Sequence, residues 1–232
     1  MGYYYGGYYG IDIAYYAIVL ISLILGIATQ GYIKRQYSRW SKKDASYNGT
    51  GAEVAQQMLA SNGVTGVGIA RVGGQLTDYY DPRDNQLHLS DENLRGGSVA
   101  SVAVACHEAG HAVQHAKGYA PVKIRTALVP VVNFTQNVWM IVFLIGVFLN
   151  TVGLVRLAIL LFAFSVIFQL VTLPVEFNAS HRALEYIKSS GQSIDLVGAR
   201  QVLTAAALTY VAAALVSILQ LLYLLGRTGD RD

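Results

Sequence analysis

The stretch His107-Glu108-Ala109-Gly110-His111 decides how this chain is organised. Residues four positions apart lie on one face of a helix, so His107 and His111 can both bind a single metal ion. Glu108 follows the first histidine directly and can reach a water molecule held by that ion. This H-E-x-x-H pattern predicts two zinc ligands and a general base.

A helix is expected around this motif, from Ser98 to Lys117. Ser98 is a good N-cap, small apolar residues fill the turns that follow, and Gly118 with Pro121 marks the end. A solvated polar turn is the alternative interpretation of the motif. It explains poorly why two imidazoles and a carboxylate interrupt a helix of small apolar residues.

The composition indicates a membrane protein. Of the 232 residues, 53% are hydrophobic and only 13% are charged, which is about half the charged fraction of an average globular protein. Long uncharged stretches alternate with charged ones, as in multi-pass membrane proteins. A net charge of +3 gives no reason to expect a nucleic-acid partner. The single cysteine, Cys106, excludes an internal disulfide and is expected to be a small buried residue.

Four stretches are long and apolar enough to cross a bilayer. They run from Ile11 to about Tyr32, from Val131 to Asn150, from Leu154 to Leu173, and from Val202 to Leu225. Pro174 is expected to close the third helix, with a separate polar helix from Glu176 to Ser190 after it. The Tyr- and Gly-rich residues 1–10 are interpreted as an aromatic belt at the membrane boundary.

The basic residues predict an orientation. No Lys or Arg precedes the first span, whereas a basic cluster between Lys34 and Lys43 follows it at once. The positive-inside rule therefore predicts an outside N-terminus and a cytoplasmic segment from Lys34 onward. We expect an integral, multi-pass protein of a bacterial cell membrane, with the lipid bilayer as a partner and the metal site on the cytoplasmic side.

The most polar part of the chain, residues 44–95, predicts a small helix-plus-hairpin unit. A short helix from Ala52 to Ala60 is capped by Thr50, with Glu53 three residues later. Three strands are expected at Val64–Val72, Leu76–Tyr80 and Gln86–Leu89. The last of these is a candidate to pair with an extended substrate by β-augmentation.

The predicted fold is mainly α, a multi-pass membrane protein with four transmembrane helices. A juxtamembrane zincin-like metalloprotease unit contains the small β-hairpin or sheet. We divide the chain into five parts. The first three are an N-terminal tail with the first span (1–33), a cytoplasmic zincin-like region (34–128) and a transmembrane hairpin (129–174). The last two are a cytoplasmic helix expected to carry a third zinc ligand (175–200) and the fourth span with a short tail (201–232).

A catalytic zinc ion needs a third protein ligand and one open position. The downstream candidates are His115, Glu176, His181 and Glu185. His115 lies one turn further along the helix and is rotated by about 80° from His107, so it is expected beside the ligands rather than among them. Glu176 is favoured as the third ligand because two spans separate it from His111. An even number of spans places both residues on the same side of the membrane. An ordinary first-turn Glu, favoured by the helix dipole, is the alternative.

Several segments resemble the YugP family of membrane zinc metallopeptidases. They are residues 105–115 around the motif, Gly118-Tyr119-Ala120-Pro121, Tyr79-Tyr80-Asp81-Pro82-Arg83, and Leu173 to Ser180. The resemblance covers nearly the whole chain. It implies one Zn²⁺ per chain and hydrolysis of a protein or peptide substrate, expected to be membrane-associated, and it does not identify that substrate.

A more distant similarity concerns the segment that begins at Glu176, which is similar to the third-ligand helix of HtpX-type membrane proteases. In those proteases an aspartate occupies the position of Ser180 and supports a zinc-ligating histidine. Asn178 or Ser180 would have to provide that support here.

The expected mechanism uses His107, His111 and Glu176 as zinc ligands and Glu108 as the base that deprotonates the attacking water. A further donor is expected for the developing oxyanion. His181, Arg182 and Tyr119 are candidates for it, and anchoring at the interface or phospholipid contact is the alternative for each.

Two other functions remain open at this point. An intramembrane protease would bury its zinc helix in a span, but Arg95 and Lys117 flank this helix closely. A non-hydrolytic zinc-binding scaffold or sensor would have no need of Glu108 and would prefer a fourth protein ligand. We therefore expect a metalloendopeptidase with a juxtamembrane site.

Overall fold

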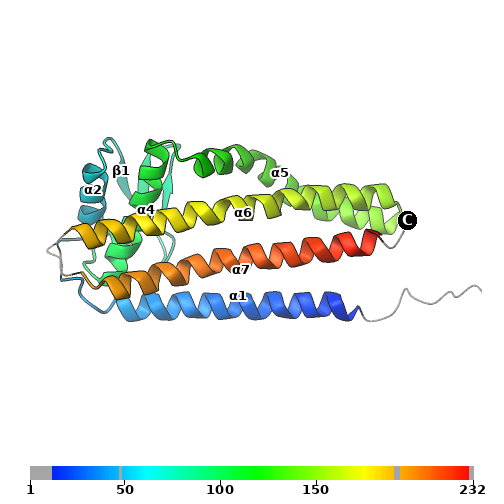
Figure 1. Ribbon diagram of the computed structural model, residues 1–232, viewed down its shortest axis with the longest axis horizontal. Coiled ribbons are helices and arrows are strands. Elements are labelled where there is room, and N and C mark those ends of the chain that lie inside the picture. The colour runs from blue at the N-terminus through cyan, green and yellow to red at the C-terminus, as the bar shows by residue number, and fades with distance from the viewer. Residues whose placement is uncertain (1–11, 47–48, 191–193, 230–232) are drawn as a thin grey trace, which may run out of the picture.

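A computed structural model describes residues 12–46, 49–190 and 194–229, so the predicted aromatic belt at residues 1–10 lies outside the described residues. The protein is mainly helical and elongated, with long helices side by side and a small mixed unit against one end (Figure 1). Contacts join neighbouring long helices in the order α5, α6, α7 and α1.

The four long helices are α1 (Ile13–Trp40), α5 (Ala120–Phe148), α6 (Val152–Ser189) and α7 (Leu196–Gly229). Each is long enough to cross a membrane and contains an 18-residue apolar stretch, with a mean hydropathy over that stretch of 2.0, 1.8, 2.4 and 2.2 respectively. The predicted multi-pass fold with four spans is therefore confirmed. Each helix extends beyond the apolar stretch that predicted it, because polar residues at the ends continue the same backbone hydrogen bonding.

Pro174 does not end the third span, contrary to the expectation. It lies inside α6, which continues without a break from Val152 to Ser189. Proline removes one backbone hydrogen bond and disfavours a helix interior. Here the turn beyond it is held by packing, since Val175 and Glu176 are 0% and 3% exposed. The segment that carries Glu176 is consequently a rigid extension of a membrane span.

The mixed unit contains α2 (Gly51–Ser61), α3 (Asp91–Arg95) and α4 (Val99–Ala116), with strands β1 (Gly68–Val72), β2 (Tyr79–Asp81) and β3 (Gln86–Ser90). The capping box expected for α2 is present. The Glu53 backbone N–H donates to the Thr50 hydroxyl at 3.3 Å, and the Thr50 N–H donates to the Glu53 carboxylate at 2.7 Å.

The sheet has the order β1-β3-β2. Strand β3 is central, parallel to β1 with Leu87 opposite Ile69, and antiparallel to β2 with Leu87 opposite Tyr80. Both edges of β3 are therefore occupied within the protein. The expectation that Gln86–Leu89 pairs with a substrate is wrong, and β2 is the edge strand on the side of α4.

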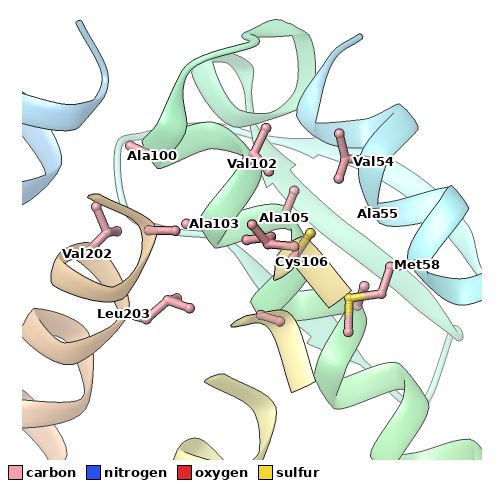
Figure 2. Packing of buried hydrophobic residues seen from close by; sticks show 14 of the residues in the cluster. Val54, Ala55, Met58, Ala100, Val102, Ala103, Ala105, Cys106, Val202 and Leu203 are labelled. Atoms are coloured by element: carbon pink, nitrogen blue, oxygen red, sulfur yellow. The ribbon is translucent and has the colours of Figure 1, made fainter. Parts of the chain in front are cut away.

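Helix α4 forms the centre of the hydrophobic core. It is capped by Ser98, whose hydroxyl accepts from the Ser101 N–H at 3.0 Å. Small side chains of α4 pack against α2 on one side and α7 on the other (Figure 2). Cys106 is fully buried in this core, as expected, and burial raises the pKa of its thiol.

Candidate metal centre

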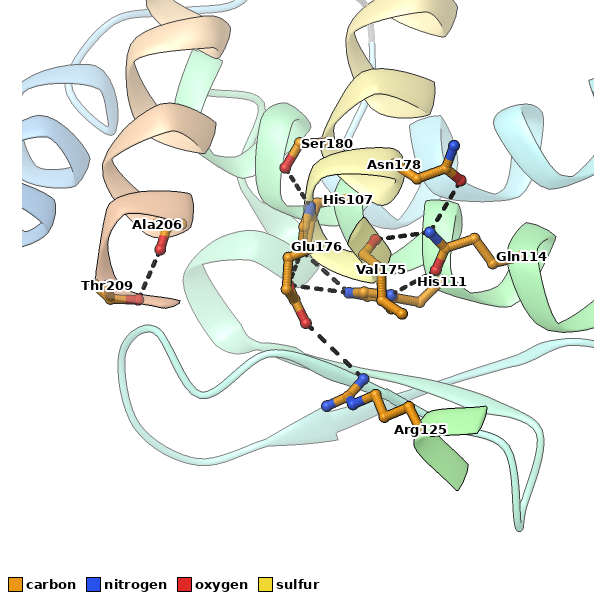
Figure 3. A network of polar contacts seen from close by, with 10 residues as sticks. All are labelled: His107, His111, Gln114, Arg125, Val175, Glu176, Asn178, Ser180, Ala206 and Thr209. Carbon is orange, nitrogen blue, oxygen red and sulfur yellow. Dashed lines mark hydrogen bonds and ion pairs between the residues drawn. The ribbon is translucent and has the colours of Figure 1, made fainter. Parts of the chain in front are cut away.

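Three side chains from two helices converge in a network of polar contacts (Figure 3). His107 and His111 come from α4, with their Nε2 atoms 3.2 Å apart. Glu176 comes from α6, and its Oε2 lies 3.3 Å from His107 Nε2 and 3.6 Å from His111 Nε2. The three atoms form a nearly equilateral triangle.

This triangle fits a zinc ion. Ligands about 2.0–2.1 Å from a tetrahedral zinc lie about 3.3 Å from one another, which matches the three observed separations. Glu176 Oε2 is buried and has no hydrogen-bond partner in the protein, a costly arrangement unless a cation satisfies the oxygen. Within the described residues these three form the one group of His, Cys, Asp and Glu side chains suited to hold a metal.

The second nitrogen of His107 has a partner from α6. His107 Nδ1 lies 3.1 Å from the Ser180 hydroxyl. If Nδ1 carries the proton and donates to that oxygen, the lone pair of Nε2 points at the triangle, as a metal ligand requires. Ser180 was one of the two residues expected to give this support.

The second nitrogen of His111 is held by a residue that the sequence did not reveal. His111 Nδ1 lies 3.1 Å from Gln114 Oε1. The Gln114 amide nitrogen donates to the Val175 carbonyl at 2.7 Å and to Asn178 Oδ1 at 3.0 Å. This orientation turns the Gln114 oxygen towards the imidazole, so His111 Nδ1 donates and Nε2 is left free to bind a metal.

Asn178 and Arg182 extend this support. The Arg182 Nε donates to Asn178 Oδ1 at 2.8 Å, which fixes the orientation of the amide that faces Gln114. Gln114 is 0% exposed, so its three hydrogen bonds also satisfy polar atoms in a dry interface between α4 and α6. The spacing of Gln114, three residues after His111 on the same helix face, was the available signal.

Glu108 lies beside the triangle and is 7% exposed. It lines a cavity of about 480 Å³ that also contains His107, His111 and Glu176. Burial raises the pKa of the Glu108 carboxyl, and the neighbouring imidazoles oppose this shift. A carboxylate whose pKa is raised is better matched to accepting a proton near neutral pH.

The cavity wall brings in residues that the sequence did not predict. Arg125 from α5 and Tyr210 from α7 line it, and the strand segment Tyr79–Asp81 forms its rim. Arg125 Nη1 lies 3.9 Å from Glu176 Oε1. Both residues belong to predicted spans or their flanks, where no motif marks them.

The remaining predicted residues lie around the cavity. His115 lines it, and its Nδ1 contacts the Tyr80 hydroxyl at 3.0 Å instead of joining the triangle. Tyr119 is the N-cap of α5 and is not part of the cavity wall. His181 is exposed and pairs with Glu185 at 3.2 Å. The structure therefore brings none of His181, Arg182 and Tyr119 into the cavity as an oxyanion donor.

A bundle of membrane-spanning helices that presents an H-E-x-x-H helix beside a carboxylate suited to be the third ligand defines a membrane protein of the zinc metallopeptidase class. The family model described as "Putative neutral zinc metallopeptidase" matches residues 15–228, and the chain belongs to this family.

A curated relative is similar over most of its length. The "Putative membrane protease YugP" of Bacillus subtilis (strain 168) is 44% identical over 207 residues, which cover 88% of this chain and 92% of the relative. The expected family is thereby confirmed. No solved structure matches the chain.

Proposed function

We propose that this protein is a zinc-dependent endopeptidase that cleaves peptide bonds at the cytoplasmic face of the membrane. The observation that carries the proposal is the triangle of His107, His111 and Glu176 in the wall of a cavity that also contains Glu108. A catalytic zinc site requires three protein ligands, an open position and a nearby base.

In this proposal the triangle holds one zinc ion per chain. When bound, zinc would supply a water molecule with a pKa lowered to about 7 and a Lewis acid for the peptide carbonyl. Glu108 accepts the proton of the attacking water and passes it to the leaving amine. Ser180 and Gln114 keep the two imidazoles in the orientation and tautomer that binding requires.

Tyr210 is our candidate for stabilising the oxyanion. It lines the cavity together with His107, Glu108 and Glu176, and a phenolic hydroxyl is a good donor to a developing negative charge. Arg125 lines the same cavity and stacks over Phe168 with its guanidinium 5.9 Å from the ring centroid. It is placed to hold a substrate carbonyl.

The substrate would pair with the edge strand β2. Tyr79, Tyr80 and Asp81 form the rim of the cavity, and the antiparallel partner β3 occupies only one edge of β2. An extended peptide can add to the other edge through backbone hydrogen bonds, largely independent of its sequence. Its scissile bond would then cross the cavity beside Glu108.

The level of the site along the bundle supports a juxtamembrane location. Glu176 lies just beyond the apolar stretch of α6, and the cavity also reaches Val129 and Pro130 of α5. Among the described basic residues only Arg156, near the start of α6, and Arg227, in the last turn of α7, belong to the helix ends that lie far from the mixed unit (Figure 1). This unequal distribution of Lys and Arg supports placing the end of the bundle that carries the metal site in the cytoplasm.

Zinc content and cleavage, measured on the same purified protein in detergent, test the proposal. We expect one zinc per wild-type chain and cleavage of an unfolded substrate such as casein. Glu108→Gln should retain zinc and lose activity by about 10²–10⁴-fold, whereas Glu185→Gln, an exposed carboxylate on α6, should change neither.

The other outcomes separate the alternatives. His107→Ala and His111→Ala should lose zinc, and full zinc occupancy in the double variant would contradict the metal site. Zinc without cleavage in the wild type would favour a scaffold or sensor. Cleavage confined to substrates with a transmembrane segment, at a bond within that segment, would favour an intramembrane protease.

A further inference from the structure

A second cavity lies next to the first and is also lined by His107 and Glu108. It has a volume of about 260 Å³ and lies among α1, α4, α7 and the loop between β1 and β2. Four residues line both cavities: Asp78, His107, Glu108 and Tyr210. The second cavity is therefore adjacent to the reacting groups and not a remote surface hollow.

The walls of the two cavities differ in chemistry. The first contains charged side chains such as Arg83 and Arg125 around its rim. Of the twelve residues that line the second cavity, only the shared Asp78 and Glu108 carry a formal charge, and half are aliphatic: Ile33, Leu76, Val104, Val202, Leu203 and Ala206. Such a lining favours an apolar occupant, because water in the cavity gains few hydrogen bonds there.

One wall residue has an unusual backbone conformation. Leu76 has a φ of +58°, in the left-handed region that bulky residues rarely adopt. Its loop is closed by the Thr77 hydroxyl, which donates to the Gly73 carbonyl at 3.0 Å. Strain of this kind persists where the surroundings impose it, and it is common in ligand-binding walls.

The loop is also fastened to the first membrane helix. Asp78, which ends it, accepts hydrogen bonds from the Ser90 N–H at 2.7 Å and from Asn93 Nδ2 at 2.8 Å. The Asn93 oxygen accepts in turn from the Tyr37 hydroxyl of α1 at 2.8 Å. The wall that carries Leu76 is thus held in place before any ligand arrives.

One part of the cavity wall lies close to the predicted membrane boundary. Gln30 of α1 is part of its lining and is exposed. One turn later α1 reaches Lys34, the first residue of the basic cluster that follows the first span. A ligand that enters beside Gln30 therefore comes from the interfacial region of the bilayer.

We propose that the second cavity binds an apolar side chain of the substrate, next to the scissile bond. The substrate is then a peptide segment with a large aliphatic or aromatic residue, lying at the membrane boundary beside α1. This inference rests on the proposed peptidase function and specifies its substrate class. The occupant follows from the aliphatic half of the wall, from the four residues shared with the first cavity, and from the exposed Gln30 near the basic cluster that follows the first span.

Binding of zinc-chelating peptide hydroxamates tests the cavity without relying on turnover. Two compounds differ only in the residue beside the hydroxamate, phenylalanine in one and alanine in the other. We expect the zinc-loaded wild type to bind the phenylalanine compound at least about tenfold more tightly, which is typical of an apolar pocket. The affinities are measured by calorimetry in detergent, with zinc content determined on the same samples.

Two variants change the cavity in opposite ways. Ala206→Phe fills it and should reduce the preference to within about twofold, with zinc retained. Leu76→Gly removes part of the wall, is compatible with a positive φ, and should also weaken the preference. Thr204→Phe introduces the same side chain at an exposed position of α7 and should leave the preference unchanged.

Equal affinity for both compounds in the wild type, or a full preference in both cavity variants, would overturn the inference. So would a change in bound phospholipid with an unchanged hydroxamate preference, since the cavity would then hold a lipid chain. Peptides with the same two residues are assayed for cleavage in parallel. A preserved binding preference without any cleavage would contradict the peptidase function and leave the cavity assignment intact.

Discussion

Gly110 of α4 lies directly against the backbone of Ala179 in α6. A β-carbon placed on Gly110 would lie 2.8 Å from the Ala179 carbonyl oxygen and 3.2 Å from its Cα. Only glycine permits backbones to approach so closely. Because Gly110 stands between the two histidines of the motif, this contact sets the distance from α4 to the carboxylate of Glu176.

We expect Gly110→Ala to weaken zinc binding by about tenfold or more, because a metal site tolerates displacements of only about 0.5 Å. Overpacking should also cost about 1–3 kcal/mol of stability. Zinc affinity and thermal unfolding in detergent are the measurements. Gly153→Ala is a matched control in the first turn of α6, the helix that Gly110 contacts, since no atom would contact its β-carbon. Unchanged zinc affinity in Gly110→Ala would show that the helices can separate freely.

Gln114 is expected to act through His111 without contacting substrate. Gln114→Met preserves length and burial but removes the acceptor for His111 Nδ1 and both donors to α6. Zinc affinity should fall by about 10–100-fold, as for other residues that orient a metal-binding histidine. Gln57→Met, at an exposed position of α2, should change nothing. A loss of apo-protein stability with normal zinc affinity would mean that Gln114 has only a structural role.

The sequence was sufficient for the parts of the site that helical periodicity or the number of membrane spans determines. Helical periodicity places His107 and His111 together, and span parity places Glu176 on their side of the membrane. Those inferences depend only on local geometry and on counting hydrophobic stretches. The fold class could be predicted for the same reason, whereas the family was expected from the resemblance of its sequence motifs.

The sequence was not sufficient where packing between distant segments decides the outcome. Arg125 and Tyr210 belong to membrane helices whose rotation about their axes no local pattern specifies. The order of the strands could not be predicted from the sequence either, since β3 becomes central only through its parallel pairing with β1. Pro174 was misinterpreted because local propensity favours a helix end, whereas burial of the following turn keeps α6 continuous.

Tyr210 should matter for turnover more than for binding. Tyr210→Phe removes one hydroxyl from the cavity and should lower kcat by about 10²–10³-fold, as expected for the loss of one oxyanion donor, with KM and zinc content nearly unchanged. Tyr119→Phe, at the start of α5 and outside the cavity lining, is the matched control. A normal kcat in Tyr210→Phe would mean that Arg125 or a backbone group stabilises the oxyanion instead.

The membrane orientation can be measured by labelling single cysteines in cells with a membrane-impermeant maleimide. In a Cys106→Ala background, Thr151→Cys in the turn between α5 and α6 should react in intact cells. Ser61→Cys, exposed at the end of α2, should react only after permeabilisation. The reason is the basic cluster that follows the first span. The opposite labelling pattern would place the metal site outside the cell.

Glu176 is predicted to be indispensable, and Ser180 to be supportive. Glu176→Gln keeps the size and helix propensity of the residue but replaces the carboxylate oxygen that lies 3.3 Å and 3.6 Å from the two histidines. Zinc binding and peptide cleavage should therefore be lost together, while α6 remains folded.

Ser180→Ala removes only the hydroxyl beside His107 Nδ1, which lies 3.1 Å away, so zinc affinity should fall by about 10–100-fold and recover at high zinc. Both variants are compared by zinc titration followed by cleavage at saturating zinc. Activity of Ser180→Ala should then approach that of the wild type, whereas Glu176→Gln should stay inactive. Wild-type zinc affinity in Glu176→Gln would reduce this residue to an ordinary buried polar group of α6, and the third ligand would have to be found elsewhere.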